Sequence, residues 1–123
     1  MLDTSVLIGA IPAEIIDDID DFGASFFVRA ELARGLRRLE GSSEPGRARM
    51  RGQLISALDD LPDFWHAFGA SESEAYSSLT AASEAAVRSK VAFIAAHAVA
   101  QEVPLFTRDA GFTRFDGLDV RLA

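Results

Sequence analysis

The chain has 123 residues, of which 49% are hydrophobic and 25% are charged, and these values are typical of a single globular domain. Its 19 acidic and 12 basic residues give a formal net charge of −7, which argues against a protein that wraps nucleic acid non-specifically with a basic surface. The absence of cysteine excludes disulfide scaffolds, cysteine-ligated zinc and thiol catalysis.

Apolar runs alternate with amphipathic segments, which predicts strands and helices in turn. Residues 2–8 form a short apolar run interrupted by polar residues, which predicts a strand. Pro12 suits the first turn of a helix, and Gly23 is its stop signal. A second apolar run over 25–28 predicts another strand. Leucines at helical spacing then predict a helix over 30–39.

The middle of the chain continues this alternation. The composition of residues 41–46 is that of a loop, and the amphipathic helix after it precedes a third strand, which we expect over 64–68. Ser71 and Glu74 have the spacing of a capping box. This spacing predicts a helix over 72–86.

The last part of the chain completes the predicted fold class. Residues 91–99 are apolar on almost all sides, which predicts a helix that packs on both faces. Strands are expected over 103–107 and 118–122. Strands that alternate with helices indicate an α/β fold, in which a mostly parallel sheet carries helices on both faces. Because no linker or repeat is visible, we expect one domain over residues 1–123.

The charges are unevenly distributed along the chain. Residues 29–51 carry seven arginines against three acids, whereas residues 1–28 and residues 52–87 each carry six acids and no base. The arginine-rich block is compatible with a phosphate-binding surface, a surface for an acidic partner, or a solvated helix face. No apolar run approaches the ~18 residues that cross a bilayer, and we expect a soluble, cytoplasmic protein.

Polar residues that follow the apolar runs mark the candidate site, because ligands of parallel sheets bind beyond the carboxyl ends of the strands. This rule selects Asp3, Ser5, Glu31, Thr107 and Asp109. The three carboxylates would repel one another without a cation, and oxygen ligands favour Mg²⁺ or Mn²⁺. Such an ion activates water and neutralises phosphate, which is the chemistry of phosphodiester hydrolysis. Taken singly, each acid is more often a capping, turn or surface residue.

Four segments of the chain occur in a fixed order. They read LDTSVLI from residue 2, SFFVRAELARGL from residue 25, IAAHAVAQEVPLFTRDAGF from residue 94 and GLDVRLA from residue 117. Together they resemble the PIN domain, and in particular the VapC toxins of bacterial toxin–antitoxin pairs. The resemblance implies a three-layer α/β/α fold with a central, mostly parallel sheet of about four or five strands. It also implies an Mg²⁺- or Mn²⁺-dependent endoribonuclease, a cognate VapB-like antitoxin and, in some members, a homodimer.

The resemblance also implies roles for individual residues. Asp3 matches the first acid of the family, Glu31 matches the acid of the xAEL motif, and Asp109 matches the acid of the TxD motif. These three residues would hold the metal ion and carry catalysis. Ser5 and Thr107 would lie beside them and hydrogen-bond a carboxylate or a metal-bound water.

One position departs from the family pattern. A further metal-binding aspartate of the family stands three residues before the isoleucine of the IAA run and eighteen before the TxD acid, and both spacings fall on Val91. An alternative function is therefore a catalytically impaired PIN-like module that binds the antitoxin or RNA, and a DNA nuclease is a third. Arg88 and Lys90 lie near Val91, and they are candidates for contact with a substrate phosphate.

Histidine and aromatic residues have a structural interpretation as well as a functional one. His97 stands in the apolar helix without a second ligand at metal-binding spacing, which favours a core histidine. Several aromatic side chains are able to stack on unpaired bases, but their place in apolar runs favours core packing. These side chains are Phe26, Phe27, Phe64, Trp65 and Phe68.

Overall fold

The computed structural model describes all 123 residues. Its first half consists of α1 (Thr4–Leu7), α2 (Ala13–Asp17), the 3-10 helix η1 (Ile19–Asp21), β1 (Ala24–Ser25), α3 (Phe26–Glu40) and α4 (Pro45–Asp59). Its second half consists of β2 (Trp65–His66), α5 (Ala70–Ser78), α6 (Glu84–Val87), α7 (Val91–Gln101), β3 (Leu105–Thr107), the 3-10 helix η2 (Ala110–Arg114) and β4 (Val120–Leu122). No helix is both long and apolar enough to span a membrane.

The strands form two parallel pairs that the N-terminal segment joins. β1 pairs with β2, and β3 pairs with β4. Leu2 lies between the pairs, since its N–H donates to the Gly23 carbonyl at 2.8 Å and it forms a parallel bridge with Phe106. Backbone hydrogen bonds therefore connect β2, β1, Leu2, β3 and β4 in that order. This connection confirms the predicted α/β fold with parallel strands.

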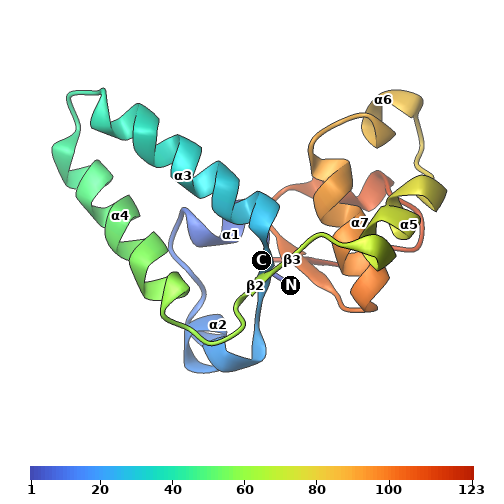
Figure 1. Cartoon of the computed structure of the whole chain (residues 1–123), viewed down its shortest axis with the longest axis horizontal. Helices are drawn as coiled ribbons and strands as arrows, with labels where there is room; N and C mark the ends of the chain where they lie inside the picture. The colour runs from blue at the N-terminus through green and yellow to red at the C-terminus, as the bar shows by residue number, and fades with distance from the viewer.

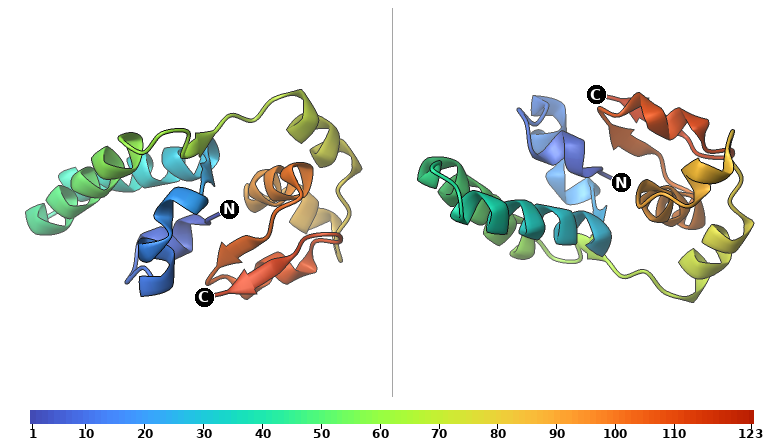
Figure 2. Two further views of the ribbon diagram at one scale, coloured as in Figure 1. Left: turned by 90° about the horizontal axis from the view of Figure 1, so that it is seen from below. Right: turned by 90° about the horizontal axis from the view of Figure 1, so that it is seen from above.

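The helices extend to both sides of these strands (Figures 1 and 2). α3 and α4 form a long hairpin on one side of the molecule, and α5, α6 and α7 lie on the other (Figure 1). Both ends of the chain lie beside β3, because Asp3 N–H donates to the Phe106 carbonyl at 2.9 Å and Ala123 N–H donates to the Thr107 carbonyl at 2.9 Å. The first residues of the chain are thereby fixed next to the end of β3.

The core consists of buried apolar side chains from almost every element. α7 contributes an almost continuous buried run that includes Ile94, which confirms the prediction for residues 91–99. His97 in this helix is fully buried, as expected of a core histidine. Phe64 is also buried, but Phe26 and Phe27 are 49% and 36% exposed, so the prediction of core packing is wrong for these two rings. Both rings lie at the edge of the core, where Phe26 is next to Trp65 and Phe27 contacts Phe93.

Two of the predicted strands are mostly helical. In the run over 2–8, Leu2 alone makes a strand contact, and Thr4–Leu7 form α1. In the run over 25–28, Ser25 belongs to β1 and its Oγ accepts a hydrogen bond from Phe27 N–H at 3.1 Å. Ser25 is thus the N-cap of α3, and the residues after it are helical. Short apolar runs do not distinguish a buried strand from the start of a buried helix.

The predicted helix over 72–86 is divided into α5 and α6. Glu72 rather than Glu74 makes the capping contact, since its Oε1 accepts a hydrogen bond from Gly69 N–H at 3.1 Å. The chain leaves the helix after Ser78, because Ala81 bridges to Phe115 and Thr80 Oγ1 donates to Asp116 at 2.8 Å. Contacts with a distant segment therefore override the local helical pattern. The third predicted strand, over 64–68, is shortened to β2.

Asp59 joins the end of α4 to α3 and β2. Its two carboxylate oxygens accept hydrogen bonds from Arg29, from Nε at 2.9 Å and from Nη2 at 2.7 Å. The indole Nε1 of Trp65 also donates to Asp59 Oδ1 at 2.7 Å. The hydrogen bonds from Arg29 hold the pKa of Asp59 below its ordinary value.

Replacement of Asp59 with asparagine should lower the free energy of unfolding by about 1 kcal/mol near neutral pH, because the ion pair is partly exposed to solvent. The pKa of Asp59 is lower in the folded than in the unfolded chain. Its contribution is therefore complete above about pH 4 and is lost as the pH falls through the folded pKa. Urea unfolding at about pH 7 and about pH 2 measures the difference in the free energy of unfolding between wild type and Asp59→Asn, and Asp60→Asn is the control. An equal difference between wild type and Asp59→Asn at both pH values would contradict it.

Candidate active site

Asp3 is buried at the point where the N-terminal segment leaves the sheet and enters α1, with 5% of its surface exposed. Two hydroxyl groups donate to its Oδ2, Ser5 Oγ at 2.8 Å and Thr107 Oγ1 at 2.8 Å. Thr107 is the last residue of β3 and Ser5 lies in α1. Side chains that are far apart in sequence therefore hold one carboxylate oxygen, and the hydrogen bonds expected of Ser5 and Thr107 are present.

Asp109 belongs to this network through its backbone. Its N–H donates to Thr107 Oγ1 at 2.9 Å, and the N–H of Arg108 donates to Ser5 Oγ at 2.9 Å. The side chain of Asp109 has a different contact, since Oδ1 accepts a hydrogen bond from Gly111 N–H at 2.8 Å and caps η2. The turn after β3 is thus tied to Ser5 and Thr107, while the Asp109 carboxylate is exposed and occupied by the helix cap.

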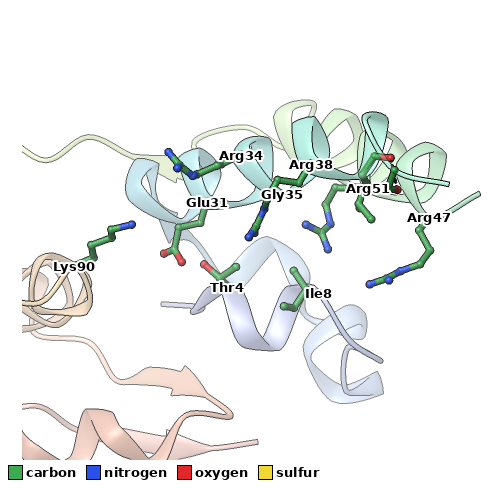
Figure 3. Close-up of a pocket in the computed structure, with 11 residues that line it drawn as sticks. Thr4, Ile8, Glu31, Arg34, Gly35, Arg38, Arg47, Arg51 and Lys90 are labelled. Atoms are coloured by element: carbon green, nitrogen blue, oxygen red, sulfur yellow. Dashed lines mark hydrogen bonds between the residues drawn. The ribbon is translucent and has the colours of Figure 1, made fainter. Parts of the chain in front are cut away.

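Glu31 extends from α3 toward α1, and its carboxylate lies next to Thr4 (Figure 3). The pKa of Glu31 is raised above its ordinary value, chiefly by desolvation and further by the Asp3 charge. The Thr4 hydroxyl and the Lys90 charge act in the opposite direction and offset part of this increase. The Thr4 Oγ1 atom is buried and makes no hydrogen bond of normal geometry in the structure. Glu31 and Asp3 are thus close enough for one charge to affect the other.

The three predicted acids do not form one cluster in the structure. No group of three or more histidine, cysteine, aspartate or glutamate side chains is positioned to hold a metal ion. The charge of Asp3 acts on Glu31, whereas the Asp109 side chain is turned to Gly111. The carboxylates of Asp3 and Glu31 fit a divalent cation in their chemistry, because carboxylate oxygens are hard ligands and a cation would offset both the desolvation and the Asp3 charge that raise the pKa of Glu31.

A pocket of about 640 Å³ opens beside Glu31, between α1, α3 and α4 (Figure 3). We call it the arginine pocket; it is lined by Thr4, Ile8, Glu31, Arg34, Gly35, Arg38, Leu39, Ser42, Arg47, Arg51 and Lys90. Of the two cations predicted to contact phosphate, Lys90 lines this pocket and faces Glu31, whereas Arg88 does not line it. Val91 is the first residue of α7, directly after Lys90.

A smaller depression of about 350 Å³ adjoins the arginine pocket and shares Glu31, Arg34 and Lys90 with it. Its other lining includes Phe27 and Phe93, whose rings are stacked with centroids 5.1 Å apart. An exposed aromatic ring therefore lies next to the predicted acid and its neighbouring cations.

The sequence indicates one basic block over residues 29–51, but it does not indicate that four of these arginines line the pocket beside Glu31. Gly35 is the one sequence feature that could have indicated this pocket, because a glycine in the middle of a helix is unfavourable unless packing requires it. Thr4 is likewise missed as a neighbour of Glu31. Its hydroxyl is recognisable only when α1 is known to be a helix.

Comparisons with known proteins agree with this architecture. The model of the PIN domain family matches residues 1–118. The crystal structure of VapBC2 from Rickettsia felis bound to a DNA fragment from their promoter contains a chain that is 20% identical, with a TM-score of 0.70, and the match covers 100% of this chain and 97% of that chain. At this identity the likeness shows the fold alone. No curated protein sequence matches. Because the family model extends over almost the whole chain, this protein belongs to the PIN domain family.

Proposed function

We propose that this protein is a metal-dependent endoribonuclease and the toxin of a VapC-like toxin–antitoxin pair. The observation that carries this proposal is the buried Asp3 carboxylate, which two hydroxyls orient at the end of the parallel strands and which lies close to Glu31. Membership of the PIN family supports a nuclease. The similar fold of a chain in a VapBC2 complex supports the toxin–antitoxin assignment.

In this proposal Asp3 and Glu31 hold Mg²⁺ or Mn²⁺, and Asp109 is a third ligand once its carboxylate leaves the cap of η2. When bound, the ion supplies an activated water molecule and neutralises charge on the phosphate. Ser5 and Thr107 fix the orientation of Asp3 by donating to Oδ2. Their hydrogen bonds leave Asp3 Oδ1 as the oxygen without a side-chain donor.

RNA is the substrate of this proposal, and the surroundings of these acids suit a single-stranded nucleic acid. The arginine pocket carries four arginines and Lys90 against Glu31, and this excess of positive charge suits a phosphate backbone. Lys90 contacts a substrate phosphate in this proposal, and Arg88 reaches a neighbouring one. Phe27 offers an exposed ring on which an unpaired base can stack. We place this activity in the cytoplasm, with residues 1–123 acting as one domain.

A protein partner is the second part of the proposal. Ile8, directly after α1, and Met50 of α4 are 51% and 70% exposed and line one depression, and Ile16 of α2 is 54% exposed; exposed apolar side chains that adjoin one another favour a binding surface. We propose that a cognate VapB-like antitoxin covers part of this surface. A homodimer is an alternative use of the same apolar residues.

A catalytically impaired module that binds the antitoxin or RNA is the alternative function. It is favoured by the absence of a cluster of three acids and by Val91 at the position where the family has an aspartate. In this case the chain would retain its binding surfaces and lack turnover.

Metal removal tests the proposed activity. Purified protein with Mg²⁺ or Mn²⁺ should cleave structured RNA, excess EDTA should stop cleavage, and added Mn²⁺ should restore it, because Asp3 and Glu31 would lose their shared cation. A DNA of the same sequence is the control and should remain intact. Gel electrophoresis of the labelled RNA and DNA measures the cleaved fraction under each condition. Cleavage in EDTA would overturn the metal dependence, cleavage of DNA alone would favour a DNA nuclease, and no cleavage of either strand would favour the binding module.

A further inference from the structure

The arginine pocket contains guanidinium groups without acidic partners. The ion pairs of the molecule use Arg29, Arg37, Arg47 and Arg121. Arg34, Arg38 and Arg51 therefore make no ion pair, although all three line the pocket. Glu31 is the single acid in the lining. A group of unpaired cations at one concave surface is a binding site for an anion.

Gly35 allows one of these guanidinium groups to enter the pocket. It is buried in α3, and a Cβ atom added to it would lie 2.5 Å from Arg51 Nη1. Arg51 reaches across from α4, so the missing side chain on α3 provides the space that its guanidinium occupies. Since glycine is a poor helix former, its use here has a packing reason.

The arginines of the pocket also repel one another. Arg51 is half-buried, and desolvation together with the charges of Arg47 and Arg38 lowers the pKa of its guanidinium. An anion bound between these guanidinium groups would offset their mutual repulsion. An arginine guanidinium is suited to this role, because its planar donors match two oxygens of one phosphate.

We propose that Arg34, Arg38 and Arg51 form a subsite for the phosphate backbone of an RNA strand whose scissile bond lies at Asp3 and Glu31. This inference rests on the proposed function and names the groups that hold the strand away from the cleaved bond. The pocket is continuous with the acids, because Thr4, Glu31 and Lys90 line it too.

The lining favours a nucleic acid over an acidic protein segment. Ile8 and Leu39 are its only apolar residues, so a peptide would find few anchors in it. Apolar residues gather instead in an adjoining depression of about 250 Å³, which includes Leu7, Met50 and Leu54. The chemistry of the arginine pocket is therefore that of repeated phosphates.

The salt dependence of RNA binding tests the subsite. Binding of a labelled single-stranded RNA of about 12 nucleotides is measured by fluorescence anisotropy in EDTA, which prevents cleavage. The triple variant Arg34→Gln, Arg38→Gln, Arg51→Gln should bind more weakly and lower the salt slope by about 2. Wild type should thus lose roughly 16-fold more affinity than this variant when salt rises from about 50 to about 200 mM. The matched triple variant Arg37→Gln, Arg49→Gln, Arg121→Gln removes the same charge outside the pocket and should retain the wild-type slope.

The variant Gly35→Ala tests the same subsite without a change of charge. Its methyl group displaces the end of the flexible Arg51 side chain, so the helix should remain intact and RNA binding should weaken as much as in Arg51→Gln. Thermal unfolding confirms that each variant is folded. If the triple variant of Arg34, Arg38 and Arg51 binds RNA with the wild-type affinity and salt slope, the subsite is overturned. If this variant instead loses antitoxin binding and keeps RNA binding, the pocket belongs to the antitoxin. RNA binding that depends on these arginines in a wild type that does not cleave would contradict the nuclease and support the subsite.

Discussion

Replacing Asp3 with asparagine should reduce RNA cleavage by roughly 100-fold or more, since an anionic ligand is lost from the site. Asparagine has almost the same shape, and its Oδ1 can still accept hydrogen bonds from Ser5 and Thr107. The charge beside Glu31 disappears, so one of the causes that raise the pKa of Glu31 is removed. Initial rates on a labelled RNA with Mn²⁺ measure the loss, and an NMR titration of Glu31 measures the pKa.

The stability of this variant separates a chemical role of Asp3 from a structural one. Because Asp3 is a buried carboxylate close to a second acid, its neutral replacement should leave the free energy of unfolding unchanged or increase it. Asp20→Asn, an exposed acid of η1, is the control and should change neither rate nor stability. A folded Asp3→Asn protein that cleaves RNA at the wild-type rate would contradict the assignment of Asp3.

The parts of the site that the sequence predicts are those that depend on sheet topology. Asp3 and Thr107 are 104 residues apart, yet both follow apolar runs, and parallel strands bring their carboxyl ends to one edge. The hydrogen bond from Thr107 to Asp3 is the direct result. In the same way, the long helices α3 and α4 follow from periodicity over many residues, and α7 follows from a run that is apolar on almost all sides.

The parts that the sequence does not predict depend on local competition for hydrogen bonds. The TxD spacing brings Asp109 to the correct turn, but its carboxylate accepts from Gly111 N–H, and the sequence does not reveal that this cap exists. Thr4 is similar, because its position beside Glu31 requires α1 to begin where a strand is predicted. A run of a few residues is too short to decide between those two structures.

Packing of two helices decides which arginines are free. The sequence indicates a basic block over residues 29–51 but does not separate its members. The hairpin of α3 and α4 pairs Arg29 with Asp59, and neighbouring acids take Arg37 and Arg47. Arg51 is left facing α3 across Gly35. The proposed phosphate subsite thus depends on the folded hairpin of α3 and α4. The number of charges in the sequence indicates only that this segment is positively charged.

The resemblance to PIN domains implies a metal-binding aspartate where this chain has Val91, and on this basis Val91→Asp should strengthen metal binding. The new carboxylate would stand at the first residue of α7, next to Lys90, whose ammonium faces Glu31 (Figure 3). An acid at this position suits the N-terminus of the helix, so the variant should fold. The Mn²⁺ concentration that gives half-maximal RNA cleavage should fall roughly 10-fold or more, because the site gains an anionic oxygen ligand.

The same experiment decides between the nuclease and the impaired module. If the module is correct, wild type has no turnover and Val91→Asp creates it; if the nuclease is correct, both cleave and the variant requires less Mn²⁺. Val91→Asn is the matched control, since it adds a polar group of similar size without charge and should resemble wild type. Rates measured over a series of Mn²⁺ concentrations compare the three proteins. Equal rates and equal Mn²⁺ requirements in wild type and Val91→Asp would contradict the view that Val91 deprives this site of a ligand, and Asp3 and Glu31 would then suffice for the metal.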